Sequence, residues 1–136
     1  MNPFVEIENV TLSYSDELRE PAVQDLSMSI EEGEFSAVVG PSGCGKSTLM
    51  KLVTGLLFPQ AGQVRVDGAQ VDSPLKIAGM AFQNPVMLPW RKTLENLLLP
   101  LEIVSPHRER LRKEKKAYHQ QAEELLKTVG LEGCGD

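Results

Sequence analysis

The sequence has only two cysteines and no long apolar run. Cys44 and Cys134 stand far apart without metal-ligand spacing, so we expect free thiols rather than a disulfide framework or a zinc site. No stretch reaches the roughly 18 apolar residues of a transmembrane helix. The N-terminus also lacks the basic and apolar regions of a signal peptide. These absences favour a cytosolic protein.

Basic charge is also scarce. The sequence has fourteen Lys and Arg and nineteen Asp and Glu, which gives a formal net charge of −5 at pH 7. This balance argues against a general nucleic-acid surface, so no nucleic-acid partner is expected. Residues 107–116 are the exception, with six basic and two acidic side chains. We interpret them as a solvated helix face, and contact with an acidic partner or lipid head groups is the alternative.

Residues 40–48 have the phosphate-binding pattern of Gly, four residues and Gly-Lys-Ser, between a strand-like run and a helix-like run. Glycines keep Cβ atoms away, so backbone N–H groups can surround phosphate oxygens, and the positive end of the following helix, residues 49–57, points at them. Lys46 is predicted to reach the β- and γ-phosphates of ATP, and Ser47 to coordinate Mg²⁺. The predicted nucleotide contacts in this loop are Gly40, Ser42, Gly43, Cys44, Gly45, Lys46, Ser47 and Thr48.

Several strands are predicted around this loop. Residues 34–39 and 77–82 are apolar with little alternation, which predicts central strands covered on both faces. Further strands are predicted over residues 4–14, 23–30 and 63–68, the last closed by the Asp-Gly turn of a small hairpin.

Beyond residue 92 the pattern becomes helical. Thr93 is a candidate N-cap, and Pro100 is expected to limit its helix to about two turns. Residues 106–129 predict a longer helix with one apolar face, ended by Gly130. The 136 residues suffice for one modest domain, and the order of elements predicts an α/β fold built around the phosphate loop.

The sequence resembles the ATP-binding subunit of ABC transporters at Tyr14, at residues 40–48, and at residues 79–91, where Gln83 precedes a Leu-Pro-Trp-Arg element. That element is most similar to the branch serving nitrate, sulfonate and taurine importers. The resemblance implies an incomplete P-loop NTPase core with an antiparallel β arm over residues 1–92, and the start of a helical subdomain over residues 93–136. The implied function couples ATP binding and hydrolysis to solute uptake.

The resemblance also implies roles outside the loop. Tyr14 would stack on adenine, a contact worth on the order of 1 kcal/mol beyond burial, with a core tyrosine as the alternative. Gln83 would reach Mg²⁺ and the attacking water, with an amide that caps a turn as the alternative. Lys46 and Gln83 are thus the catalytic candidates, and Ser47 and Gln83 the candidate Mg²⁺ ligands. Residues 87–91 would lie near the surface that docks a permease, where Trp90 is either exposed or packed.

Several parts needed for hydrolysis are missing from the sequence. Hydrolysis needs one carboxylate at the end of an apolar strand to hold Mg²⁺ and another to polarise water. No run of four apolar residues followed by Asp-Glu comes after Gln83, and the Leu-Ser-Gly-Gly-Gln signature and switch histidine of the family are absent. The chain therefore resembles the N-terminal half of such a subunit. We expect it to bind nucleotide, to hydrolyse it poorly alone, and to be marginally stable, because the strand at 34–39 would expose an unpaired edge.

Two other functions stay open. One is a non-catalytic remnant that binds nucleotide or a partner. The other is a P-loop nucleotide kinase, which is disfavoured because two strands and Tyr14 precede the loop and no arginine-rich lid follows it.

The resemblance implies three partners. They are a transmembrane permease, a second ATP-binding subunit facing the first across two ATP molecules and, indirectly, an external solute-binding protein. The implied location is cytoplasmic, peripheral on the inner face of the cell membrane.

Overall fold

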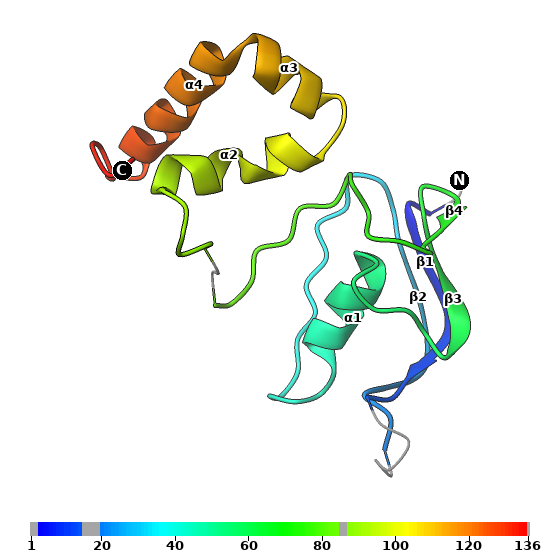
Figure 1. Ribbon diagram of the computed structural model, residues 1–136. Coiled ribbons are helices and arrows are strands. Elements are labelled where there is room, and N and C mark those ends of the chain that lie inside the picture. Colours follow the sequence, from blue (N-terminus) through cyan, green and yellow to red (C-terminus); the bar gives the residue numbers. More distant parts are fainter. Residues whose placement is uncertain (1–2, 15–19, 85–86, 136) are drawn as a thin grey trace. The chain divides into compact units, whose positions relative to one another are not determined.

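The computed structural model describes residues 3–14, 20–84 and 87–135, which divide into two compact units, Met1–Met80 and Ala81–Asp136. The first unit contains a sheet and one helix, and the second contains three helices (Figure 1). None of the described helices is both long and apolar enough to cross a bilayer.

A four-stranded antiparallel sheet with the strand order β2-β1-β3-β4 forms the first unit. Its strands are β1 Val5–Leu12, β2 Val23–Ile30, β3 Ala61–Val66 and β4 Ala69–Gln70. Helix α1, Lys46–Val53, packs against this sheet, because Leu49 and Leu52 belong to the same buried core as Ile7 and Val64. The strand predicted over residues 23–30 and the hairpin with its turn at residues 67 and 68 are confirmed.

A bulge in β1 explains why its apolar alternation is broken. The buried side chains of this strand are Val5, Ile7, Val10 and Leu12. The pairing with β2 shifts between Ile7 and Val10, where Asn9 has a positive φ of 50°. Gly62 lies opposite, and a Cβ atom there would come within 2.4 Å of the Asn9 carbonyl oxygen. The bulge restores the core-facing direction of the second half of β1, and it requires glycine at residue 62.

The prediction of central strands over residues 34–39 and 77–82 is wrong for this structure. Both segments are irregular; Phe35 is 95% exposed, Val39 88% and Ile77 72%. A strand buried on both faces takes its backbone hydrogen bonds from neighbouring strands, and no strand among the described residues pairs with either segment. Most of their apolar side chains are exposed to solvent.

The turn that follows β2 fixes one carboxylate. Glu34 accepts hydrogen bonds from the backbone N–H of Glu31 and the hydroxyl of Ser36, both at 2.9 Å. These bonds, the backbone one first, hold the pKa of the Glu34 carboxyl below its usual range. The resulting stabilisation of the turn is present at neutral pH and is lost as the pH falls through this lowered pKa.

The second unit consists of α2 Thr93–Ile103, α3 His107–Lys113 and α4 Lys115–Thr128. Its buried side chains are Leu98 of α2 and Ala122 and Leu126 of α4. Gly130 has a positive φ of 78° directly after α4, which confirms the predicted end of this helix.

Three details of the helix predictions are wrong. Lys92, not Thr93, is the N-cap of α2, since the Glu95 carboxylate accepts from the Lys92 backbone N–H at 3.1 Å. Pro100 does not end α2, because proline removes one backbone donor while its own carbonyl still accepts from Val104 at 3.1 Å. The helix predicted over residues 106–129 is broken at Glu114, whose φ of −119° and ψ of 33° lie outside the helical range.

Candidate functional site

The phosphate-binding pattern at residues 40–48 forms a turn that leads directly into α1. Gly43 and Gly45 have positive φ angles of 83° and 93°, which side chains rarely adopt. A Cβ atom at Gly45 would come within 2.4 Å of the Ala22 carbonyl oxygen, and one at Gly40 within 2.7 Å of the Cys44 sulfur. The backbone path of the loop therefore requires glycine at residue 45, where the close contact is with backbone, and no acidic side chain lies in the first turn of α1.

Lys46 carries the positive charge of this loop. Its Nζ donates to the carbonyl oxygens of Gly40 at 2.8 Å and Pro41 at 2.6 Å, and it lies 3.5 Å from the sulfur of Cys44. The ammonium group is thus folded back over the loop and bound to neutral acceptors. Charged oxygens bind an ammonium group more strongly than neutral carbonyls do, so a phosphate can compete for it.

The two hydroxyls after Lys46 have different surroundings. Ser47 is exposed and its hydroxyl has no partner among the described residues. Thr48 is 5% exposed, and its hydroxyl lies 3.0 Å from the hydroxyl of Tyr14. The ring of Tyr14 is 56% exposed, so Tyr14 is not a core residue, and it lies beside the first turn of α1.

The donor set of this loop fits a nucleotide phosphate with a divalent cation. Backbone N–H groups at the left-handed glycines, one ammonium group held by neutral acceptors and one hydroxyl without a partner among the described residues are the groups that such a ligand needs. Among the residues predicted for the site, those of the loop and Tyr14 lie in the first unit.

Gln83 lies in the second unit, on an exposed bend. Its predicted contact with Mg²⁺ and water stays a prediction. Trp90 is 76% exposed.

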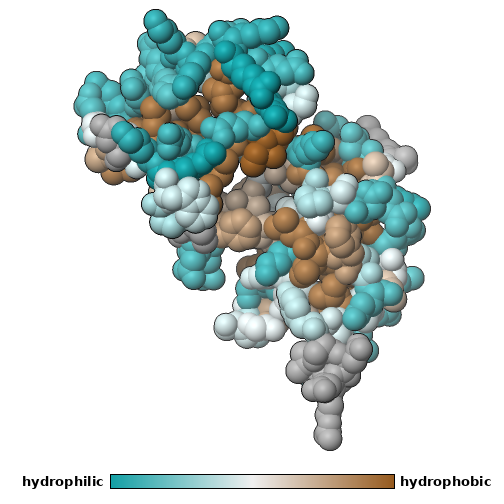
Figure 2. Space-filling model, in the orientation of Figure 1, coloured by the Kyte–Doolittle hydropathy of each residue, from teal (hydrophilic) through white to brown (hydrophobic). Residues whose placement is uncertain are grey.

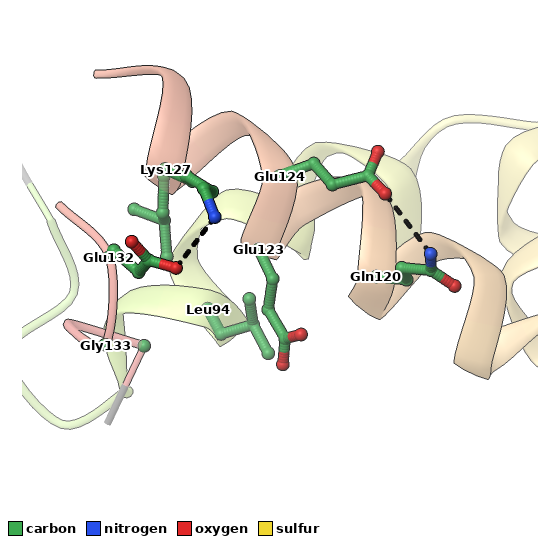
Figure 3. Close-up of a pocket in the computed structure, with 9 residues that line it drawn as sticks. Leu94, Gln120, Glu123, Glu124, Lys127, Glu132 and Gly133 are labelled. Carbon is green, nitrogen blue, oxygen red and sulfur yellow. Dashed lines mark hydrogen bonds and ion pairs between the residues drawn. The ribbon is translucent and has the colours of Figure 1, made fainter. Parts of the chain in front are cut away.

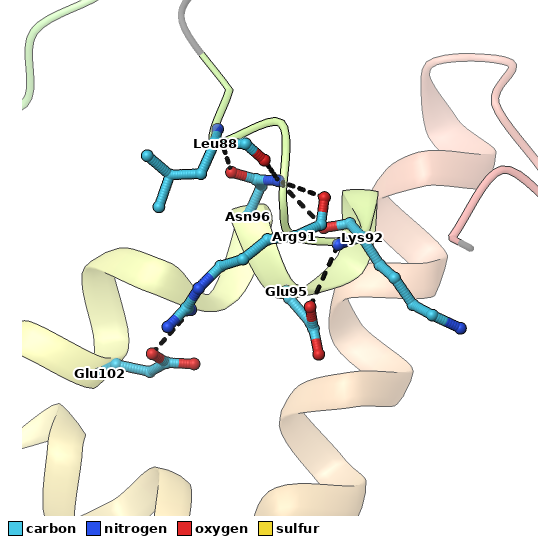
Figure 4. A network of polar contacts seen from close by, with 6 residues as sticks. All are labelled: Leu88, Arg91, Lys92, Glu95, Asn96 and Glu102. Carbon is cyan, nitrogen blue, oxygen red and sulfur yellow. Dashed lines mark hydrogen bonds and ion pairs between the residues drawn. The ribbon is translucent and has the colours of Figure 1, made fainter.

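A polar network that the sequence did not predict fixes the turn around Trp90 (Figure 4). The Asn96 side chain accepts from the backbone N–H of Leu88 at 2.8 Å and donates to the carbonyls of Leu88, Arg91 and Lys92 at 3.1–3.2 Å. Arg91 forms an ion pair with Glu102 at 2.8 Å. The available signal was an asparagine in the first turn of a helix, where its amide competes for backbone groups.

The second unit also has a cavity of about 480 Å³ between the start of α2, α4 and the turn after α4 (Figure 3). Leu94 and Leu126 line it together with Gln120, Glu124, Lys127 and Glu132. Four of its polar side chains pair with one another, Lys127 with Glu132 at 3.0 Å and Gln120 with Glu124 at 3.2 Å, and the carboxylate of Glu123 also lines the cavity. The cavity thus adds an acidic side chain, whereas the phosphate loop has the cationic group that a phosphate needs.

Comparison with protein families decides the relationship. Residues 23–136 match the family described as "ABC transporter". The chain belongs to the ABC transporter family. This membership decides against the nucleotide-kinase alternative.

Individual ABC relatives agree with this assignment. The chain is 37% identical over 134 residues to an uncharacterised ABC transporter ATP-binding protein of Methanocaldococcus jannaschii, across 97% of this chain and 47% of the relative. It is 37% identical over 121 residues to the taurine import ATP-binding protein TauB of Escherichia coli, across 89% of this chain and 45% of TauB. The chain thus spans about half the length of these curated relatives.

The fold agrees with solved ABC structures. An ATP-binding cassette solved as a dimer in a post-hydrolysis state, bound to ADP and Pi, superposes with a TM-score of 0.74 and 30% identity, across 96% of this chain and 59% of that one. Another dimeric structure of a bacterial ABC transporter cassette gives a TM-score of 0.76 with 29% identity, across 97% of this chain and 60% of that one. The fold is therefore α/β and corresponds to part of a P-loop NTPase core, with an antiparallel sheet and helices.

Proposed function

We propose that residues 40–48 bind the phosphates of ATP with Mg²⁺, and that the chain is part of the ATP-binding subunit of an ABC importer. One observation carries this proposal: the loop enters α1 through two left-handed glycines while Lys46 covers its carbonyl oxygens. The loop residues would surround the phosphates with Gly40, Ser42, Gly43, Cys44, Gly45, Lys46, Ser47 and Thr48.

Lys46 is proposed to exchange its carbonyl partners for phosphate oxygens when nucleotide binds. The Nζ group then gains charge-assisted hydrogen bonds, each worth about 1.5–3 kcal/mol. Ser47 would offer its free hydroxyl to Mg²⁺, which prefers oxygen ligands. Bound Mg²⁺ would offset phosphate charge.

Two residues outside the loop complete the proposed site. The exposed ring of Tyr14 would stack on adenine, while its hydroxyl stays on Thr48. Gln83 would sense Mg²⁺ and the attacking water, and it is with Lys46 a catalytic candidate.

The proposed role in transport rests on the relatives. TauB is a taurine import protein, which supports uptake of a nitrate-, sulfonate- or taurine-like solute. The partners would be a permease, a second ATP-binding subunit and, indirectly, an external solute-binding protein, with the chain on the inner face of the membrane. The exposed indole of Trp90, held on the turn that Asn96 fixes, would contact the permease.

We further propose that this chain alone binds ATP without sustained hydrolysis. The sequence contains no Asp-Glu pair after an apolar strand, so no candidate carboxylate is present to polarise water. A nucleotide-binding remnant is the alternative, and its lack of turnover would be the same.

Calorimetric titration with Mg·ATP tests the site, with hydrolysis measured on the same samples. Lys46→Ala should weaken ATP binding about 10- to 150-fold, the loss of one charge-assisted hydrogen bond. Lys51→Ala, which removes an equal charge from the same helix, is the matched control and should bind ATP like the wild type. Equal ATP affinity in the wild type and Lys46→Ala would contradict the proposed ATP site. Steady Mg²⁺-dependent ATP turnover by the wild type would contradict the proposal of binding without hydrolysis.

A further inference from the structure

The positive charge of this chain is concentrated on α3 and the start of α4. Six of its fourteen Lys and Arg lie within residues 107–116, beside two acidic residues. The rest of the chain therefore has eight basic and seventeen acidic side chains. We call the six residues the basic cluster: Arg108, Arg110, Arg112, Lys113, Lys115 and Lys116.

All six side chains of the basic cluster are exposed, and none has a hydrogen bond or ion pair to a carboxylate within the described ranges. The surface over α3 and the start of α4 is correspondingly hydrophilic (Figure 2). Neighbouring cations that repel one another are tolerated on a helix at a cost of a few tenths of a kcal/mol per pair. Such a cluster is complementary to a surface of negative charge.

We propose that the basic cluster contacts the anionic head groups of a lipid membrane. The exposed cations are spread over two separate hollows, Arg108 and Arg112 beside Glu102 and Lys115 and Lys116 beside Glu123, rather than gathered in one pocket. This spread suits a diffuse array of phosphates better than one bound carboxylate. Groups of four to eight Lys and Arg are typical of segments that bind anionic lipids. Ile103, which is 69% exposed at the end of α2 just before the cluster, adds an apolar side chain that can enter the interface.

The inference rests on the proposed function in one respect, that an importer subunit works beside a membrane. The cluster would then attract the subunit to the bilayer surface through head groups, in addition to any contact with a permease. The attraction is electrostatic, so it falls as salt screens it.

Co-sedimentation of the full 136-residue chain with vesicles tests this proposal. The wild type should sediment with vesicles of phosphatidylcholine mixed with phosphatidylglycerol, and it should stay in the supernatant with vesicles of pure phosphatidylcholine. It should dissociate from the anionic vesicles at about 1 M salt, where the Debye length is about 3 Å. Arg110→Gln with Lys113→Gln should weaken binding roughly 25-fold, about fivefold for each cation. Glutamine keeps a similar helix propensity, so α3 is preserved.

The matched control removes two cations elsewhere, Lys76→Gln with Lys127→Gln, and should keep the binding of the wild type. Equal loss in the control would overturn the proposal, because net charge alone would then explain binding. Equal binding to neutral and anionic vesicles would also overturn it. Binding to an oligoglutamate peptide without binding to anionic vesicles would overturn it as well, and would indicate an acidic protein partner.

A measurement on the wild type alone covers the case in which a variant unfolds. Anionic vesicles should attenuate the amide resonances of residues 107–116 before those of β1, and the reverse order would contradict the proposal. ATP titration is independent of this readout, so loss of the proposed nucleotide site would leave the vesicle result intact.

Discussion

Tyr14 and Thr48 connect the end of the first strand segment to the first turn of α1. Their hydroxyl oxygens lie 3.0 Å apart, and Thr48 is buried while the Tyr14 ring is largely exposed. The hydrogen bond and the ring are separable properties, because phenylalanine keeps the ring without the hydroxyl. Variants of Tyr14 can therefore separate adenine stacking from a structural role.

Tyr14→Ala is predicted to weaken ATP binding about fivefold, since an aromatic stacking contact is worth on the order of 1 kcal/mol. Tyr14→Phe should bind ATP like the wild type. Neither variant should change the affinity for inorganic tripolyphosphate, which has no base to stack. Calorimetric titration measures the affinity of the wild type and of both variants for each ligand. A parallel loss of tripolyphosphate binding in Tyr14→Ala would indicate instead that Tyr14 only supports the loop.

Among the elements, the turn before α2 depends on one amide side chain. Asn96 binds the N–H and carbonyl of Leu88 and the carbonyls of Arg91 and Lys92 (Figure 4). These bonds hold the turn that presents Trp90 to solvent. The conformation of this turn is thus fixed by a side chain of α2, the helix that follows it.

Asn96→Ala is predicted to destabilise this turn by about 2 kcal/mol, since several hydrogen bonds worth about 0.5–1.5 kcal/mol each are lost. Hydrogen exchange at the Leu88 amide should then be roughly 30-fold faster. Gln120→Ala, which removes one exposed hydrogen bond to Glu124, is the control and should leave that amide unchanged. Unchanged exchange at Leu88 in Asn96→Ala would show that the turn is held by other contacts.

The elements also show what a sequence can predict. The strand over residues 23–30, the Asp-Gly hairpin and the stop at Gly130 follow from local preferences, and the structure has all three. The strands expected over residues 34–39 and 77–82 would need adjacent strands to pair with, and apolar composition alone does not show whether such strands are present.

The same distinction holds at the site. Spacing alone predicts the loop at residues 40–48. The contact between Tyr14 and Thr48 and the folding of Lys46 onto the loop carbonyls depend on three-dimensional approach, so spacing does not reveal them.

The molecule as a whole is two small units with much apolar surface in solvent. Phe35 and Val39 of the first unit and Trp90 and Ile103 of the second are each more than two-thirds exposed. The curated relatives are about twice as long as this chain, and its solved neighbours superpose over nearly all of it. The phosphate loop lies wholly within the first unit, so the proposed nucleotide binding can be measured on this chain.

The most direct test of that binding is to titrate Mg·ATP into the isotopically labelled 136-residue chain and to follow its amide resonances. We predict saturable shifts at residues 43–48 and at Tyr14, with little change at the hairpin turn of Asp67 and Gly68. No shift in the loop at saturating Mg·ATP, or shifts confined to the cavity beside α4, would contradict it.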